Sequence, residues 1–414
     1  MSVGRSIDPR QMIDTFRSVV RFAPVETDPI ARRLRRCATV DDLRRVARRR
    51  LPRGVFDYID GGAEDERTLG RNSADFSSLG FRPRVLRDVS SIDTSTEAFG
   101  RVHPMPIMLA PTGFTRITAS PGELAVARAA ERAGLSYSLS TMATRSIEEV
   151  ASAAPGGDHW FQVYTWKDRG LVEEMVKRAQ VAGYRGLWLT VDTAVLGRRE
   201  RDVRRGYTIP PKIGPGTIVD GVLHPSWTLD FITNPPIVFA NVVGLNDEDG
   251  SDPVSLAEHM MRQFDQALSW RDVEWLRGIW DGPLVLKGIQ RVDDAVRARD
   301  AGVDGIALSN HGGRQLDDAP SPVSLIEPVR QAVGDGSTIV CDGGVRRGSD
   351  VVKALALGAD LCSIGRPYLY AMGAAGERGV DHLIGFLREG LERTMALTGS
   401  RRIDEIDRDL VEWR

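Results

Sequence analysis

Short apolar runs alternate with longer amphipathic segments from about residue 105 onward. The eight apolar runs cover residues 107–113, 137–142, 160–165, 186–192, 284–288, 305–311, 338–344 and 361–366. Segments with helical periodicity lie between several of them, at residues 122–133, 168–182, 291–301 and 349–357. Strand-length runs that alternate with helical segments are typical of βαβ units and a parallel sheet. Continuous apolar strands fit a sheet that is covered on both faces.

Eight strand–helix units are the number of a (β/α)8 barrel, so the pattern predicts an α/β fold of the TIM-barrel class. The competing architecture is a doubly wound open sheet, which usually carries a glycine-rich phosphate turn after its first strand. The first run here is followed by Ala110-Pro111-Thr112-Gly113, which is not such a turn. The barrel is therefore the preferred prediction.

The interval between the runs at 186–192 and 284–288 does not follow this alternation of strands and helices. It is far longer than an ordinary connecting loop. We predict that the helix of the fourth unit covers about residues 255–278, and that residues 200–252 form a lid inserted at the mouth of the barrel. Much of the interval between the two runs is not expected to be regular helix, because it contains prolines at positions 210, 211, 215, 225, 235, 236 and 253.

The segments outside the barrel differ in character. Residues 1–37 are polar and rich in arginine, and they are predicted to form a poorly anchored arm. Residues 38–75 have helical periodicity, with a plausible helix start at Thr39, and predict an N-terminal helical extension. The barrel domain is assigned to residues 38–400 and a C-terminal tail to residues 401–414.

Composition narrows the class of protein. Apolar residues make up 42% and charged residues 27% of the 414 positions, and the formal net charge of -2 indicates no nucleic-acid partner. Cys37, Cys341 and Cys362 form no C-x-x-C pair, and an odd count argues against a disulfide framework. The first residues lack a signal-peptide core, and no run approaches the length of a transmembrane helix. We therefore expect a cytoplasmic protein without a metal site.

Polar residues end every apolar run. In a (β/α)8 enzyme the active site lies at the C-terminal ends of the strands, so these residues are expected to converge. Packing of the core alone would not require this pattern. The residues concerned are Thr112, Ser140, Thr141, Gln162, Tyr164, Thr190, Asp192, Lys287, Ser309, His311, Asp342, Gly365 and Arg366.

The seventh and eighth units have the composition of a phosphate site. The segments 342–346 (DGGVR) and 364–367 (IGRP) each follow a strand. Glycines let backbone N–H groups approach phosphate oxygens, and arginine adds a planar charged donor. Lys287, at the end of the fifth strand, would face the other end of the ligand. Burial of an unpaired lysine is costly, so Lys287 requires an anionic partner.

His311 ends the sixth strand within the sequence SNHGGR and is the strongest candidate for a catalytic base. Arg314 and Arg199 could bind a carboxylate through paired hydrogen bonds. Asp192, at the end of the fourth strand, could orient the imidazole of His311 and stabilise its charged form. The other five histidines lack such neighbours and are interpreted as surface or core residues.

Six motifs occur in order along the chain between about residue 38 and residue 400. They are LPRGVFDYIDGGAED (51–65), LTVD (189–192), GRRE (197–200), SNHGGRQLD (309–317), DGGVRRG (342–348) and IGRP (364–367). Taken together, these motifs resemble the FMN-dependent 2-hydroxy-acid oxidoreductases. The family includes glycolate oxidase, mandelate dehydrogenase and bacterial respiratory L-lactate dehydrogenase.

The resemblance implies a set of substrate contacts. His311 would be the active-site base and Asp192 its partner. Tyr164 would hydrogen-bond the substrate hydroxyl. The substrate carboxylate would be bound by Arg314, Arg199 and Tyr58.

The resemblance also implies the contacts of the cofactor, FMN. Lys287 would stand beside the N1/O2 edge of the flavin and stabilise its anionic reduced form. The isoalloxazine would lie near the backbone of Pro111, Thr112 and Gly113 and the side chains of Ser140, Gln162, Thr190 and Ser309. The ribityl and phosphate groups would be held by Asp342, Gly343, Gly344, Arg346, Gly365 and Arg366.

Departures from the family pattern bear on substrate and electron acceptor. Met142 stands where glycolate oxidase has tryptophan, so the side-chain pocket differs. The L-lactate dehydrogenase branch of the family is favoured by the long insertion and by the segments PTGFTR (111–116) and HPSW (224–227). Membership of this branch implies L-lactate as the substrate and a quinone or other respiratory compound as the electron acceptor. The resemblance implies a homotetramer as well.

The apolar residues around 227–239 fit either a lid packed on the barrel or a peripheral contact at the inner face of the cell membrane.

Two alternatives stay open from the residues. The same core motifs would serve an FMN-dependent oxidase of another 2-hydroxy acid or of a peptide-derived cofactor precursor. A barrel that binds a phosphate ligand without redox chemistry would keep the strand 7 and 8 site, but it would give His311, Asp192 and Arg314 no shared task.

Overall fold

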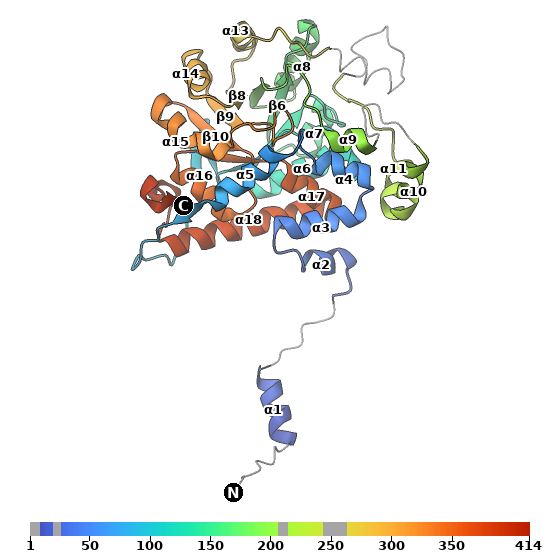
Figure 1. Ribbon diagram of the computed structural model, residues 1–414, viewed down its shortest axis with the longest axis vertical. Coiled ribbons are helices and arrows are strands. Elements are labelled where there is room, and N and C mark those ends of the chain that lie inside the picture. The colour runs from blue at the N-terminus through green and yellow to red at the C-terminus, as the bar shows by residue number, and fades with distance from the viewer. Residues whose placement is uncertain (1–8, 20–25, 206–213, 243–262) are drawn as a thin grey trace.

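Eight parallel strands close into a barrel in the computed structural model, which describes residues 9–19, 26–205, 214–242 and 263–414 (Figure 1). The strands pair in the order β10-β11-β4-β5-β6-β7-β8-β9. This confirms the predicted (β/α)8 architecture and excludes the open sheet. The strands are β4 Ile107–Leu109, β5 Ser136–Ser140, β6 Asp158–Tyr164, β7 Gly186–Thr190, β8 Leu284–Ile289, β9 Gly305–Ser309, β10 Thr338–Asp342 and β11 Leu361–Ile364.

Several apolar runs extend beyond the strands that they predicted. β4 ends at Leu109 and β9 at Ser309, whereas the corresponding runs continue to residues 113 and 311. Two residues after the end of β9, His311 has a left-handed backbone, with φ of 56°. The extra residues lie in the loops at the mouth of the barrel, where an active site is expected.

Helices cover the outside of the barrel. Four begin and end within one residue of the predicted segments: α6 Glu123–Ala133, α8 Arg169–Val181, α14 Val292–Asp300 and α16 Gly348–Ala356. The others are α7 Ile147–Ala153, α13 Trp270–Ile279, α15 Pro322–Val333, α17 Arg366–Ala375 and α18 Glu377–Thr398. The pattern missed α17 because it is buried on all sides and has no polar face.

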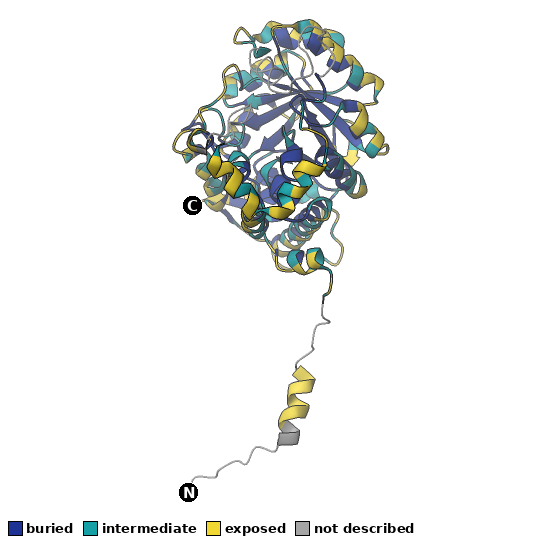
Figure 2. Cartoon of the chain, turned by 90° about the vertical axis from the view of Figure 1, so that its right-hand side faces the viewer, coloured by how far each residue is buried: buried dark blue, intermediate teal, exposed yellow. Residues whose placement is uncertain are grey.

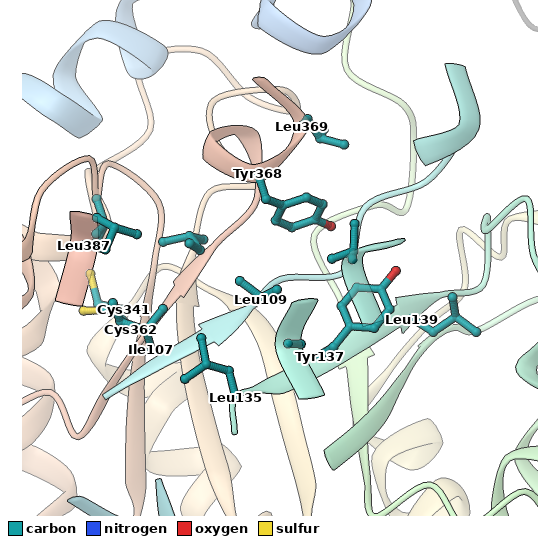
Figure 3. Close-up of a cluster of buried hydrophobic side chains, with 14 of the residues drawn as sticks. Ile107, Leu109, Leu135, Tyr137, Leu139, Cys341, Cys362, Tyr368, Leu369 and Leu387 are labelled. Carbon is teal, nitrogen blue, oxygen red and sulfur yellow. The ribbon is translucent and has the colours of Figure 1, made fainter. Parts of the chain in front are cut away.

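The barrel has two sets of buried side chains. One set packs between strands and helices, and Figure 3 shows part of it, with Leu109 of β4, Tyr137 of β5 and Tyr368 of α17. The second set comes from the opposite face of the strands and fills the barrel, with Trp160 and Trp188 as its largest members. A hairpin of β2 (Thr96–Ala98) and β3 (Arg101–His103) precedes β4.

The N-terminal extension is helical, as predicted. It comprises α3 (Val40–Arg50), α4 (Arg53–Asp60) and α5 (Arg67–Ser77), and Thr39 caps α3 by accepting a hydrogen bond from the N–H of Asp42. The arm contains α1 (Pro9–Val19) and α2 (Pro29–Leu34). α2 is anchored by buried Leu34, whereas the side chains of residues 12–19 on α1 are exposed (Figure 2).

The C-terminal segment 401–414 is ordered by backbone pairing. Its strand β12 (Val411–Trp413) pairs with β1 (Leu79–Phe81), which follows α5. Leu410 and Val411 are buried. Short 3-10 helices occur at η1 (Thr115–Ile117), η2 (Ile403–Glu405) and η3 (Arg408–Leu410).

The insertion differs from its prediction in two respects. Its described part contains the helices α9 (Glu200–Arg205), α10 (Pro215–Leu223) and α11 (Pro225–Thr233), so the expectation of little regular helix is wrong there. Pro215 and Pro225 begin helices instead of breaking them, because the first helical position needs no N–H donor. The predicted helix at 255–278 is also shorter: α13 begins only at Trp270, after Ser269, whose N–H bonds the carboxylate of Asp272 at 2.7 Å. Residues 255–262 lie outside the described part of the chain.

Candidate active site

The predicted site residues gather at one pocket at the C-terminal ends of the barrel strands. Of the residues given a role toward substrate or cofactor, all but four line it: Tyr58, Pro111, Thr112, Gly113, Ser140, Tyr164, Arg199, Lys287, His311, Arg314, Asp342, Gly343, Gly344, Arg346, Gly365 and Arg366. The remaining four lie immediately behind. Asp192 contacts His311, Ser309 contacts Lys287, Gln162 contacts Ser140, and Thr190 is the strand partner of Lys287.

His311 and Asp192 form the pair expected of a base and its orienting carboxylate. Nδ1 of His311 lies 2.9 Å from Oδ1 of Asp192, whose side chain is only 3% exposed. Burial lowers the pKa of His311 below its usual 6.5, although the charge of Asp192 opposes this shift. The ring is therefore neutral at neutral pH. With Nδ1 engaged by the carboxylate, Nε2 is the nitrogen that can accept a proton.

Two arginines and a tyrosine form the cationic side of the pocket. The guanidinium carbons of Arg314 and Arg199 lie 5.0 and 5.6 Å from the ring centroid of Tyr58. Burial and the nearby charge of Arg199 lower the pKa of Arg314 to about 9. Arg314 therefore lacks a full counter-charge, and a bound carboxylate would supply one.

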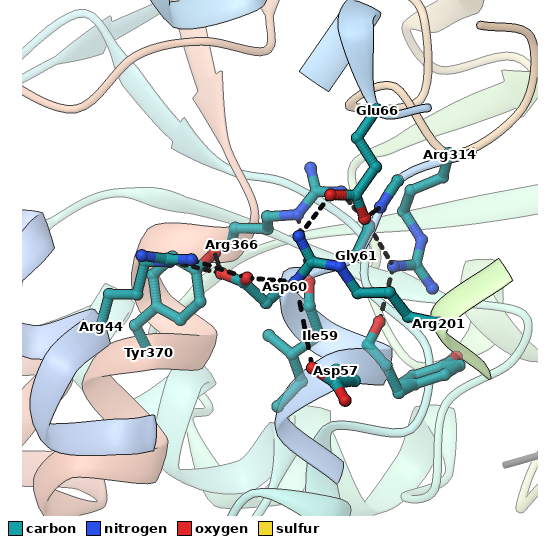
Figure 4. A network of polar contacts seen from close by, with 12 residues as sticks. Arg44, Asp57, Ile59, Asp60, Gly61, Glu66, Arg201, Arg314, Arg366 and Tyr370 are labelled. Carbon is teal, nitrogen blue, oxygen red and sulfur yellow. Dashed lines mark hydrogen bonds and ion pairs between the residues drawn. The ribbon is translucent and has the colours of Figure 1, made fainter. Parts of the chain in front are cut away.

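The segment 58–61 at the end of α4 is tied to this side of the pocket through its backbone carbonyls (Figure 4). Arg314 donates to the carbonyl of Tyr58 at 2.6 Å. Arg366 donates to those of Ile59 and Gly61 at 3.0 and 2.7 Å. The hydrogen bonds explain why α4, far from the barrel strands in sequence, contributes to the site.

Arg366 also donates to the carbonyl of Gly312 at 2.7 Å, so all three of its guanidinium nitrogens bind backbone oxygens. Its side chain thus joins α4 to the loop of His311. Arg346 donates one guanidinium N–H to the backbone carbonyl of the preceding residue, Val345, at 2.8 Å. Of the two arginines predicted for the phosphate, Arg346 is the one with more guanidinium donors left for a ligand.

Lys287 has the anionic partner that its burial requires. Its Nζ lies 3.0 Å from Asp342 Oδ2 and 3.0 Å from Ser309 Oγ, which in turn donates to Asp342 at 2.7 Å. Burial disfavours the charged form of Lys287, but Asp342 and Asp192 outweigh it and raise the pKa. Lys287 is therefore a fixed positive charge in the pocket.

The residues present fit FMN. Gln162 is buried, and its Nε2 has no hydrogen-bond partner within the described residues, although its Oε1 accepts from Ser140 at 3.0 Å. Oγ of Ser363, which lines the pocket, is also buried without a partner there. Such orphaned groups are costly unless a ligand satisfies them. Gly344 approaches α5 so closely that a Cβ atom would lie 2.0 Å from the carbonyl oxygen of Asn72, so only glycine fits this cradle.

Sequence reasoning missed several residues that line the pocket. Phe264 follows the insertion and packs on Tyr164, with ring centroids 5.1 Å apart. Phe114 follows the predicted flavin segment and meets the ring of Tyr58 edge-on at 6.1 Å. Asn72 comes from α5. The apolar character of Phe114 gave a weak signal, but nothing in the sequence marked Phe264 or Asn72.

Comparison with known proteins shows the family of the chain. The family of FMN-dependent dehydrogenases matches residues 47–413. An L-lactate dehydrogenase from Caulobacter sp. is 42% identical over 380 residues, which are 90% of this chain and 98% of that protein. An L-lactate dehydrogenase from Yersinia pestis is 40% identical over 372 residues, 89% of this chain and 96% of that protein.

A solved structure is similar over nearly the same length. The crystal structure of a monotopic membrane protein, (S)-mandelate dehydrogenase, superposes with a TM-score of 0.88 at 39% identity. The match covers 92% of this chain and all of the other. Since sequence and structure agree over nine-tenths of its length, the chain belongs to the family of FMN-dependent dehydrogenases and is an FMN-dependent oxidoreductase.

Proposed function

We propose that the protein oxidises a small L-2-hydroxy acid, L-lactate to pyruvate, and passes the electrons from FMN to a respiratory quinone. The observation that carries the proposal is that His311, paired with Asp192, lines the same pocket as Arg314 and Arg199. A base and a carboxylate site in one pocket suit a substrate with a hydroxyl next to a carboxylate. Two dehydrogenases of the same family that are similar throughout are named for L-lactate.

Each side chain then has a defined task. Arg314 and Arg199 bind the substrate carboxylate, and Tyr58 adds a contact to it. Tyr164 holds the hydroxyl; burial raises its pKa, so it stays protonated and can donate a hydrogen bond. Nε2 of His311 takes up a proton released as the alcohol becomes a ketone, and Asp192 stabilises the resulting imidazolium.

FMN, when bound, supplies the acceptor for the two electrons that leave the substrate. Ser140, Gln162, Thr190, Ser309 and the backbone of residues 111–113 would hold its ring. Lys287 would place a positive charge beside it. Asp342, Gly343, Gly344, Arg346, Gly365 and the backbone of Arg366 would hold the ribityl chain and the phosphate.

(S)-Mandelate is the second candidate substrate. The pocket wall includes Phe114, Met142 and Phe264, which could face an aromatic side chain as well as a methyl group. The similar solved structure is a mandelate dehydrogenase. The same core would also accept a longer or peptide-derived 2-hydroxy acid, whereas family membership argues against a barrel without redox chemistry.

A substrate panel tests the proposal. We expect kcat/KM to be highest for L-lactate among L-lactate, (S)-mandelate, glycolate and longer 2-hydroxy acids, with pyruvate as the product. Phe264→Ala should shift the ranking toward bulkier acids, because it removes the ring that packs on Tyr164. A wild-type preference for (S)-mandelate would replace L-lactate by the second candidate, and inactivity with every acid would contradict the proposal.

The pH dependence of kcat/KM is expected to have its acidic limb below pH 6.5. The pKa of His311 is lowered by burial, and the ring accepts a proton only when it is neutral, so activity is lost as the pH falls through that pKa. Asp192→Asn should move the limb to still lower pH and slow the reaction, because it removes the charge that favours the imidazolium. A limb above pH 6.5 in the wild-type enzyme would contradict this assignment.

The insertion supports a peripheral membrane contact, which is part of the proposal. Among the described residues, no helix has both the length and the apolar character required to cross a membrane. α11 is nevertheless docked on one side and apolar on the other. Trp227 donates to the carbonyl of Ile117 at 2.7 Å, and Asp230 accepts from the hydroxyl of Ser120 at 2.6 Å. The exposed apolar residues of α10 and α11 are Ile218, Val219, Val222, Leu223, Leu229, Phe231 and Ile232.

Flotation with liposomes measures this contact. The double variant Val222→Asp/Ile232→Asp should lower liposome binding by about 10²-fold, because each buried apolar side chain contributes roughly 1.5–3 kcal/mol. Reduction by L-lactate should not change, whereas reoxidation by membrane quinone should slow. Val181→Asp/Leu397→Asp is a matched control, since both residues are exposed and lie outside the insertion. Equal flotation of both double variants would exclude α10 and α11 as the contact.

The oligomeric state belongs to the same proposal. The homotetramer that the family resemblance implies stays a prediction, and light scattering on the purified FMN-bound enzyme measures the oligomeric state.

Electron transfer to dioxygen instead of quinone would make the protein an oxidase, and peroxide formation in aerobic turnover would reveal this activity.

A further inference from the structure

The turn that carries His311 has an unusual backbone. His311, Gly312 and Gly313 all have positive φ, at 56°, 66° and 74°. This conformation is ordinary for glycine but unfavourable for histidine, and it persists only where neighbouring groups hold it. Something must therefore hold the backbone of His311 in place, and neither the Asp192 contact nor the proposed chemistry supplies this restraint.

Part of the restraint comes from Ser309 Oγ, which accepts the N–H of His311 at 3.1 Å, and from Arg366, which donates to the carbonyl of Gly312 at 2.7 Å.

A further part comes from two buried asparagines. The N–H of Gly313 donates to Asn310 twice, to its backbone carbonyl and to its side-chain Oδ1, each at 3.0 Å. Asn72 of α5 pairs with Asn310 through both side-chain amides, at 2.9 Å in one direction and 2.7 Å in the other. Asn310 also donates to the carbonyl of Pro320 at 2.9 Å. Asn72 is 2% and Asn310 1% exposed, so water does not compete for these bonds.

α5 lies unusually close to the loops of both β9 and β10. A Cβ atom on Gly313 would lie 2.6 Å from the backbone nitrogen of Leu69, and one on Gly344 would lie 2.0 Å from the carbonyl oxygen of Asn72. The helix therefore touches the turn of the proposed base and the glycines of the proposed phosphate cradle together. Asn72 stands where those two loops meet.

We propose that Asn72 is a positioning residue for the oxidation, which through its amide pair with Asn310 holds the left-handed turn that sets His311 against Asp192. This inference rests on the proposed role of His311 as the base. Asn72 acts through Asn310 and touches neither the reacting atoms nor the proposed carboxylate site. Loss of the pair should let the turn relax, and a misplacement of about 1 Å can cost about 10²-fold in rate.

A double-mutant cycle on the limiting rate of flavin reduction tests the inference. Asn310→Ala should lower this rate by about 10- to 10²-fold, and Asn72→Ala should lower it several-fold. The double variant should be no slower than Asn310→Ala, because both substitutions remove one shared interaction. Multiplicative effects of the two substitutions would overturn the inference. Ser77→Ala, an exposed position on the same helix, is the matched control and should match the wild-type rate.

The pH profile separates positioning from a purely structural role. The charged groups that act on His311 are Asp192 after β7, Lys287 on β8 and Arg314 in its own loop, and Tyr164 on β6 lines the same pocket. A looser contact with Asp192 weakens the influence that favours the imidazolium. The acidic limb of flavin reduction in Asn72→Ala should therefore move to lower pH, while FMN affinity and pyruvate affinity change less than about threefold. An unmoved limb, or a loss confined to FMN affinity, would overturn the inference.

A folding defect does not remove the test. If Asn72→Ala does not retain FMN, Asn72→Leu takes its place in the cycle, since it keeps the volume of the side chain, adds no charge and removes both hydrogen bonds to Asn310. The same non-additivity and the same shift of the limb are expected. The variant His311→Gln separates failure of the proposed function from failure of this inference alone. If that variant reduces its flavin at the wild-type rate, the proposed function fails; if it is slow while the asparagine variants are unaffected, only this inference fails.

Discussion

Replacing His311 by glutamine is expected to slow the limiting rate of flavin reduction by about 10²- to 10⁴-fold, the usual contribution of a positioned acid or base. Glutamine can still donate a hydrogen bond to Asp192, but it cannot take up a proton. FMN should remain bound, because the imidazole contacts Asp192 and not the residues proposed for the phosphate. Anaerobic stopped-flow absorbance with L-lactate measures the rate directly.

The same substitution elsewhere provides the control for this experiment. His382 on α18 bonds the carbonyl of Cys37 at 2.7 Å and lies outside the pocket, so His382→Gln should reduce its flavin at the wild-type rate. If His311→Gln also reduced its flavin at the wild-type rate, with FMN fully bound, a group other than His311 would be the one that accepts the proton.

Replacing Arg314 by methionine is expected to lower kcat/KM for L-lactate by about 10²-fold or more. Removing one partner of a buried charge pair costs about 2–5 kcal/mol, and each 1.4 kcal/mol is about tenfold in affinity. The substrate carboxylate would then face only Arg199, which shares its charge with Asp202 at 3.5 Å. Steady-state kinetics over a wide range of substrate concentration measure the effect.

Two further variants define what Arg314 contributes. Arg314→Lys should recover only part of the loss, since an ammonium group keeps the charge but not the planar pair of donors. Arg178→Met, on α8 and paired with Glu148, is the matched control and should leave kcat/KM unchanged. A wild-type kcat/KM for Arg314→Met would remove this residue from the carboxylate site.

Much of the site could be predicted because barrel geometry converts position in the sequence into position in space. His311, Asp192 and Lys287 lie at or just after the ends of different strands, and the closed sheet brings those ends together. The apolar runs were sufficient to give the number of barrel strands and their order along the chain. The helices that were found were those with one polar face, whereas α17, which is buried on every side, has no such pattern.

The rest of the site depends on contacts that no local pattern records. Phe264 reaches the pocket from the segment that follows the insertion, and Asn72 reaches it from a helix that precedes the barrel. Arg366 was predicted beside the phosphate from its glycine and proline neighbours, but all three of its guanidinium nitrogens bind backbone carbonyls. Such pairings follow from the packing of distant segments, and a single sequence does not encode them in its periodicity.

The central claim is that this pocket transfers electrons from an L-2-hydroxy acid to FMN. Anaerobic titration of the purified holoenzyme with L-lactate, followed by visible absorbance, tests it most directly. We expect the oxidised flavin spectrum to bleach with one equivalent of L-lactate per FMN and pyruvate to form in equal amount, while D-lactate leaves the spectrum unchanged. A flavin that stays oxidised with L-lactate and with every other L-2-hydroxy acid would contradict the account.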